Sequence, residues 1–186
     1  MPPPKKVAKK AAKKATKHPP GHRQTNDLRR AYEHMSRVEI LQRSLKPSDA
    51  KVVTTLATLA REQLEAGDNQ QAADLLRAAE HLCIAALTDP VSKRVRLSGE
   101  LVQSITEHFN ELALRAEEHW LKREEQPGVF AAIYKSTCKN ATAAFKNGAY
   151  YQALEFARAS EALAHVSPNG AYKLKRGEKV LRLTAV

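Results

Sequence analysis

One stretch of helix-forming sequence occurs twice in this chain, 81 residues apart. The first copy is GDNQQAADLLRAAEHL, starting at Gly67, and the second is GAYYQALEFARASEAL, starting at Gly148. When residues 60–82 are aligned with 141–163, eight of 23 positions are identical. A single helical hairpin cannot bury its outer face, so two copies predict hairpins that pack against each other or against a neighbour.

Helical periodicity extends this pattern to about six helices. Apolar residues recur at helical spacing in 28–45, 53–64, 72–86, 101–120, 130–141 and 153–164. Aromatic residues make up only 5% of the chain, which favours closely packed helices over a β-sandwich. The chain therefore predicts an all-α fold of stacked antiparallel helical hairpins, with Trp120 buried on the long fourth helix.

Helix ends are marked by turn and capping residues. Gly67 and Gly148 each follow a first helix, where a glycine with positive φ commonly ends it. The predicted N-caps and first-turn residues are Thr25 and Asn26 for the first helix, Asp68 for the third, and Asp89 with Pro90 for the fourth.

The repeated segment resembles the turn and second helix of tetratricopeptide repeats. The residues that carry the resemblance are Gly67, Asp68, Ala72, Leu75 and Ala79 in the first copy, and Gly148, Tyr150, Ala153, Phe156 and Ser160 in the second. The first helices depart from the family, since Ala60 and Ala141 stand where it prefers glycine. The resemblance implies a concave surface that binds peptides or protein segments, and no catalysis. The alternative is a helical bundle whose hairpins meet on alanine-rich seams.

Positive charge is concentrated at the two ends of the chain. Of the net charge of +11, residues 1–24 carry +8 and residues 172–186 carry +4, so the rest is close to neutral. We expect a disordered basic tail over 1–24, a helical domain over 25–168 and a basic extension over 169–186. Attraction to a polyanion is therefore expected at the ends.

The N-terminal tail is the strongest candidate for a binding site. Its cations are Lys5, Lys6, Lys9, Lys10, Lys13, Lys14, Lys17 and Arg23. The segment is similar to the Lys-Ala-Pro tails of linker histones and of some bacterial nucleoid proteins, which implies nucleic-acid binding. Lysine contacts phosphate as a point charge, so we expect binding without sequence specificity. The alternatives are binding to acidic lipid and a solubilising or targeting extension.

Other residue patterns give weaker candidates. RAYEH, RAAEH, RAEEH and RASEA occur from Arg30, Arg77, Arg115 and Arg158, and we expect solvent-facing Arg–Glu pairs three residues apart. A ligand-facing row is the alternative for these motifs. Glu and His are adjacent in four places, and adjacent side chains point in different directions on a helix. The two residues of such a pair cannot easily bind one ion, so we expect no metal site and no cofactor.

An enzyme is the second hypothesis for function. Arg29 and His34 have four residues between them, as in the motif of small helical RNase and nucleotide-binding domains of the HEPN family. In that chemistry a histidine acts as general acid or base and an arginine stabilises the developing phosphate charge. The family places its motif on a late helix, whereas this one is on the first.

The remaining features bear on location. Cys83 and Cys138 are the only cysteines, without a C-x-x-C pair or a secretory signal, which indicates two buried thiols in a reducing compartment. No apolar run is long enough to span a membrane. We therefore expect a cytoplasmic protein, nucleoid-associated if bacterial. Its expected function is a non-enzymatic helical-repeat module that binds a protein partner and, through its tail, nucleic acid.

Overall fold

The computed structural model describes residues 20–88, 97–121 and 128–166. Its helices are α1 (Pro20–Leu41), the 3-10 helix η1 (Gln42–Ser44), α2 (Pro47–Glu65), α3 (Asn69–Leu87), α4 (Gly99–Leu121), α5 (Gly128–Lys146) and α6 (Tyr150–His165). No strand occurs in these three ranges. The predicted all-α fold, with stacked hairpins α2–α3 and α5–α6, is confirmed. The predictions for residues 1–19, for Asp89 with Pro90 and for residues 169–186 lie outside the described residues.

The first helix begins earlier than its capping residues suggest. We predicted N-caps at Thr25 and Asn26, but α1 starts at Pro20 and contains both residues. Proline fits the first turn of a helix because its missing N–H has no helical partner there. The N-cap at Asp68 is confirmed, since its carboxylate accepts a hydrogen bond of 3.1 Å from the N–H of Gln71.

The two glycine turns have the same geometry. Gly67 has a φ of 80° and Gly148 a φ of 76°. Asp68 N–H donates to the carbonyl of Gln63, and Ala149 N–H donates to that of Ala144, at 2.9 Å in both turns. These bonds satisfy carbonyls at the end of the first helix that no helical N–H can reach. The prediction of two left-handed glycines in equivalent turns is confirmed.

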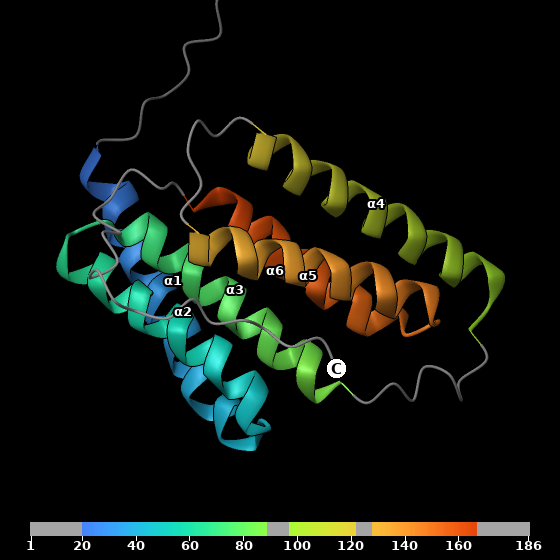
Figure 1. Cartoon of the computed structure of the whole chain (residues 1–186). Coiled ribbons are helices and arrows are strands. Elements are labelled where there is room, and N and C mark those ends of the chain that lie inside the picture. The colour runs from blue at the N-terminus through green and yellow to red at the C-terminus, as the bar shows by residue number, and fades with distance from the viewer. Residues whose placement is uncertain (1–19, 89–96, 122–127, 167–186) are drawn as a thin grey trace, which may run out of the picture.

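Two central helices organise the packing. α3 contacts α1, α2 and α6, and α6 contacts α3, α4 and α5. Figure 1 shows α4 along one side of the bundle, with α5 and α6 between it and the first three helices. The duplication therefore covers two three-helix units, α1–α3 and α4–α6, in which the third helix is central. The sequence repeat marks only the second and third helix of each unit.

The central helices α3 and α6 run antiparallel. Arg77 pairs with Glu161, His81 with Glu155, and the backbone carbonyl of Ala85 with Gln152, so positions rise along α3 as they fall along α6. Ala78 and Ala159 lie between the Arg77–Glu161 and His81–Glu155 contacts in this order, and both are completely buried. Small side chains at this point let the two helices approach closely.

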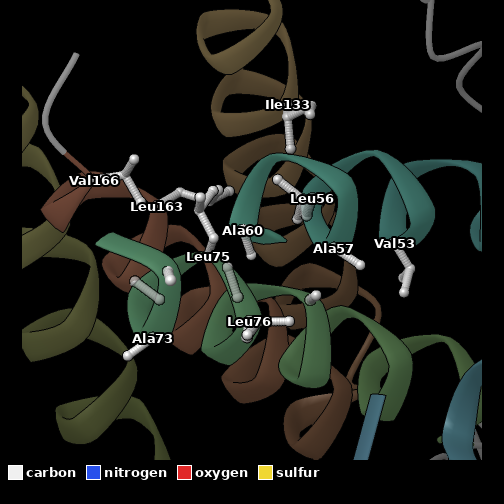
Figure 2. Packing of buried hydrophobic residues seen from close by; sticks show 14 of the residues in the cluster. Val53, Leu56, Ala57, Ala60, Ala73, Leu75, Leu76, Ile133, Leu163 and Val166 are labelled. Atoms are coloured by element: carbon white, nitrogen blue, oxygen red, sulfur yellow. The ribbon is translucent and has the colours of Figure 1, made fainter. Parts of the chain in front are cut away.

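The hydrophobic core joins both units. Figure 2 shows Leu56 of α2, Leu75 of α3 and Leu163 of α6 in one cluster, and all three side chains are fully buried. The predicted burial of Trp120 is confirmed, because its ring stacks on that of Tyr134 in α5 with centroids 3.8 Å apart. Leu101, which we expected on the same buried face of α4, is exposed. It lies in the first turn of α4, beyond the part of the helix that contributes Ile105, Leu112, Ala116 and Trp120 to the buried face.

Candidate functional site

Four carboxylates lie at equivalent positions on the two central helices. Asp74 and Glu80 of α3 correspond to Glu155 and Glu161 of α6, 81 residues later. Their side chains are only 11–14% exposed. A buried carboxylate needs cationic partners or hydrogen-bond donors, and each of the four has them. These residues form a polar layer, which we define as the four carboxylates and the Arg and His side chains that contact them.

The first part of the polar layer joins α1 to α3. His34 Nδ1 lies 2.6 Å from Glu80 Oε2, and Arg37 lies 3.3 Å from Glu80 Oε1. Burial by itself would raise the pKa of Glu80, but the hydrogen bond and charge of His34, with the charge of Arg37, outweigh burial and lower that pKa. Glu80 is therefore held as a carboxylate between two donors of α1.

The second part joins α3 to α6 at their crossing. His81 Nδ1 lies 2.7 Å from one carboxylate oxygen of Glu155, and Arg158 lies 2.6 Å from the other. Burial would again raise the pKa of Glu155, and these two partners lower it instead. One carboxylate of α6 is thus shared by a side chain of its own helix and one of α3.

The third part joins α3 to α6 and reaches the edge of α4. Arg77 of α3 lies 3.7 Å from Asp74 and 3.6 Å from Glu161. His165 Nε2 lies 3.8 Å from Glu161 Oε1, and this contact is the main reason for the lowered pKa of Glu161. The ring of His165 lies 4.0 Å from that of His119 in α4. Burial raises the pKa of Asp74. The polar layer therefore crosses α1, α3 and α6, and His119 of α4 lies against its edge.

The polar layer corrects our expectation for the RAxEH-like motifs. We predicted Arg–Glu pairs within each motif on the solvent-facing side. The arginines instead pair with acids three or four positions earlier: Arg30 with Asp27, Arg77 with Asp74, Arg115 with Glu111 and Arg158 with Glu155. Glu80 and Glu161 are turned toward neighbouring helices because their own helices are packed on three sides. The sequence signal is present, since both copies place acids at equal offsets on otherwise apolar helices.

Most histidines of the described helices serve this packing. In the part of the chain that the structure describes, no group of three or more His, Cys, Asp or Glu side chains is placed to hold a metal ion. The hydrogen bonds and ion pairs of the polar layer fix how the helices sit against each other, and each of its four carboxylates is paired with an arginine. The layer is best described as the internal frame of the domain.

The structure places the two residues of the enzyme hypothesis on different sides of α1. Arg29 has a side chain that is 72% exposed and lies 3.6 Å from Glu33. His34 faces α3, where it contacts Glu80. Five positions correspond to about 140° around a helix, so the two side chains diverge. They are not brought together on one phosphate-sized site.

The lysines of the predicted binding tail, Lys5 to Lys17, lie outside the described residues, and Arg23 lies in the first turn of α1. Cys83 and Cys138 are both free; Cys83 is fully buried and Cys138 is half-buried. Burial raises the pKa of Cys83 to about 11, so its thiol stays protonated at neutral pH. The prediction of two buried thiols is thus confirmed for Cys83.

No family model, no curated protein and no solved structure matches the chain. None of the helices within 20–88, 97–121 and 128–166 is long and apolar enough to cross a membrane. The all-α architecture, with six α-helices over these ranges, is established by the structure itself.

Proposed function

We propose that this protein is a non-enzymatic interaction module whose basic N-terminal tail binds nucleic acid without sequence specificity and whose helical body binds a protein partner. The observation that carries the proposal is the separation of charge along the chain. Residues 1–24 contain eight Lys and Arg and no acid, whereas the rest of the chain before residue 172 is close to neutral. Such a module would work in the cytoplasm, near nucleic acid.

Ion pairing in the body supports this division of labour. Within the described helices, seven arginines contact a carboxylate: Arg29, Arg30, Arg37, Arg61, Arg77, Arg115 and Arg158. A paired arginine contributes little to the attraction of a phosphate backbone, because its charge is already compensated nearby. The tail sequence has no acid to compensate its lysines.

The resemblance to tetratricopeptide repeats and two exposed leucines support a protein partner for the body. Leu114 and Leu121 of α4 are 58% and 73% exposed. They are seven positions apart and therefore lie on one face of the helix. Apolar side chains exposed together on one helix face can form part of a contact surface for another protein. Replacing both by Gln should weaken capture of that partner and leave the helical circular dichroism unchanged.

The tail proposal is tested by comparing three proteins on a duplex of arbitrary sequence. The first is the full chain, the second lacks residues 1–19, which leaves α1 intact, and the third has its seven tail lysines replaced by Gln. We expect the second and third proteins to lose most of the binding. Binding by the full chain should fall by roughly three orders of magnitude between about 50 and 200 mM salt if six phosphates are engaged. Equal affinity for all three proteins would refute the tail proposal.

The enzyme alternative is tested by incubating RNA with the full chain and with a His34→Ala variant. Under the non-enzymatic proposal we expect no histidine-dependent cleavage. A cleavage activity lost in that variant would establish the RNase hypothesis instead. Because His34 also contacts Glu80, an Arg29→Ala variant should be measured beside it. That substitution removes only an exposed side chain and its pair with Glu33.

A further inference from the structure

Helix α5 carries a row of lysines along its solvent-facing side. Lys135, Lys139 and Lys146 are all exposed, and α5 contains no acidic residue. At 100° per residue, positions four and eleven further on lie within about 40° of the first around the helix. The three side chains therefore form one row, about 16 Å long at 1.5 Å per residue. We call these three residues the α5 lysine row.

The α5 lysine row has no ion-pair partner among the described residues, since every salt bridge there involves Arg or His. Thr142 lies between Lys139 and Lys146 on the same side of the helix and is also exposed. This side of α5 thus offers three uncompensated charges, while the hydroxyl of Thr142 donates a hydrogen bond to the carbonyl of Cys138. On α3 and α6, by contrast, the arginines are paired with acids.

The duplication provides an internal comparison for the α5 lysine row. α2 and α5 have the same length, begin 81 residues apart and contact equivalent central helices. The α2 positions equivalent to the three lysines are Thr54, Thr58 and Glu65, and they are likewise exposed. Because a threonine or a glutamate is compatible with the same fold at these places, packing does not require lysine there.

From this geometry we infer that the α5 lysine row is a second contact for the phosphate backbone of nucleic acid, on the body of the protein. The inference rests on the proposed function and adds a surface to it. A row of about 16 Å spans the axial rise of about five phosphates of one strand of duplex DNA. Three flexible ammonium groups in line match a row of phosphates and carry no means of distinguishing bases.

The chemistry of α5 favours nucleic acid over a lipid surface. A helix that lies on a membrane places large apolar side chains beside its lysines. The exposed neighbours of the α5 lysine row are Asn140, Thr142, Ala143 and Asn147, of which three are polar and the fourth is a small alanine. None of the large hydrophobic side chains found exposed in the described helices lies on α5.

The test compares two full-length variants that lose the same charge. The first replaces Lys135, Lys139 and Lys146 by Gln. The control replaces Arg43, Lys46 and Lys51 by Gln, which are also exposed cations without an ion pair in the described structure. Gln keeps a helix propensity close to that of lysine, so both variants should show wild-type circular dichroism. Binding to a duplex of arbitrary sequence is measured by fluorescence anisotropy across about 50–200 mM salt, a range of about fourfold in concentration.

We expect the α5 variant to bind more weakly and with a shallower salt dependence. Three lost phosphate contacts reduce the slope of log affinity against log salt by about 2.7. Across the fourfold salt range the wild type should then lose about 40 times more affinity than the α5 variant loses. The control variant should keep the wild-type slope.

Each other outcome overturns the inference in an identifiable way. If the α5 variant keeps the wild-type slope while tail neutralisation still abolishes binding, the inference fails and the proposed function stands. Equal losses in the α5 and control variants would show that binding follows net charge alone. If the full chain does not bind the duplex even at low salt, the inference and the proposed function fail together. A loss of binding to phosphatidylserine vesicles without a loss on the duplex would assign the α5 lysine row to a membrane surface.

Discussion

The two glycine turns allow a prediction in which one type of substitution has opposite effects at different places. Gly67 and Gly148 have positive φ values of 80° and 76°. A Cβ added at either position would meet no other heavy atom within 4 Å. The cost of Gly→Ala there is therefore confined to the left-handed backbone, without any steric overlap with neighbouring side chains.

That cost can be estimated from the backbone alone. Holding an L-residue in the left-handed region costs about 1–2 kcal/mol. Alanine also lowers the backbone entropy of the unfolded chain, but this stabilises the fold only where alanine can adopt the native φ without strain. We expect Gly67→Ala and Gly148→Ala each to lower the free energy of unfolding by about 1 kcal/mol. The losses should be equal within error, because the two turns have the same hydrogen bonds.

Gly99 and Gly128 are the matched controls. They stand at the first positions of α4 and α5 and lack a positive φ, and a Cβ added at either would again meet no heavy atom within 4 Å. Gly→Ala at these positions should leave stability unchanged or raise it, by up to about 1 kcal/mol. The assay is urea unfolding followed by the helical circular dichroism signal, with the slope of the transition compared between variants.

The comparison can refute the reasoning in two ways. If Gly148→Ala is neutral while Gly67→Ala is costly, the turns are not equivalent in solution and the duplicated geometry is wrong. If all four substitutions have the same effect, left-handed strain does not determine the outcome. A shift of about 3 °C in the thermal midpoint for each turn variant would be a second measure of the same cost.

Three further predictions concern the interior. Trp120 fluorescence should be blue-shifted in the native protein, and Tyr134→Ala should shift it toward the wavelength of solvated tryptophan, because the stacked ring is lost. Glu80→Gln should destabilise the protein at pH 7 by about 1–3 kcal/mol, measured by urea unfolding, since two charge-assisted hydrogen bonds are weakened. The lowered pKa of Glu80 means that its stabilisation is complete above the unfolded value of 4.5 and is lost as pH falls through the folded value, so variant and wild type should converge in acid. Ala78→Leu should cost about 1–3 kcal/mol in the same assay through overpacking where α3 crosses α6, and a neutral result would contradict the close approach of these helices.

The hairpins can be predicted from the sequence because their signals are local. Gly67 and Gly148 end their helices through the conformation of a single residue, and Asp68 caps the next helix through a neighbouring N–H. The start of α1 is not predicted correctly because two good capping residues, Thr25 and Asn26, occur inside a helix that continues upstream. Capping residue types indicate where a helix can begin and do not exclude a longer one.

The contacts between helices cannot be predicted in the same way. Nothing local shows that Glu80 meets His34, 46 positions earlier, or that Arg77 reaches Glu161 on another helix. From the sequence alone, the motif around Arg77 predicts a solvent-facing pair, because the sequence does not show that the second copy of the repeat packs against this helix. The equal spacing of acids in α3 and α6 is the one signal of these contacts in the sequence. It indicates buried acids only if each central helix is assumed to be covered on several sides.

The antiparallel contact between α3 and α6 has a consequence for the order of events during synthesis. The equivalent central helix begins 81 positions further along the chain, so it leaves the ribosome about 4 to 16 seconds later at ordinary rates of elongation. During that interval α1, α2 and α3 can associate through short connections, while the side of α3 around Ala78 and Arg77 still faces water. Alanine there exposes little apolar area, which makes an unfinished first unit a poor nucleus for aggregation while it waits for the second.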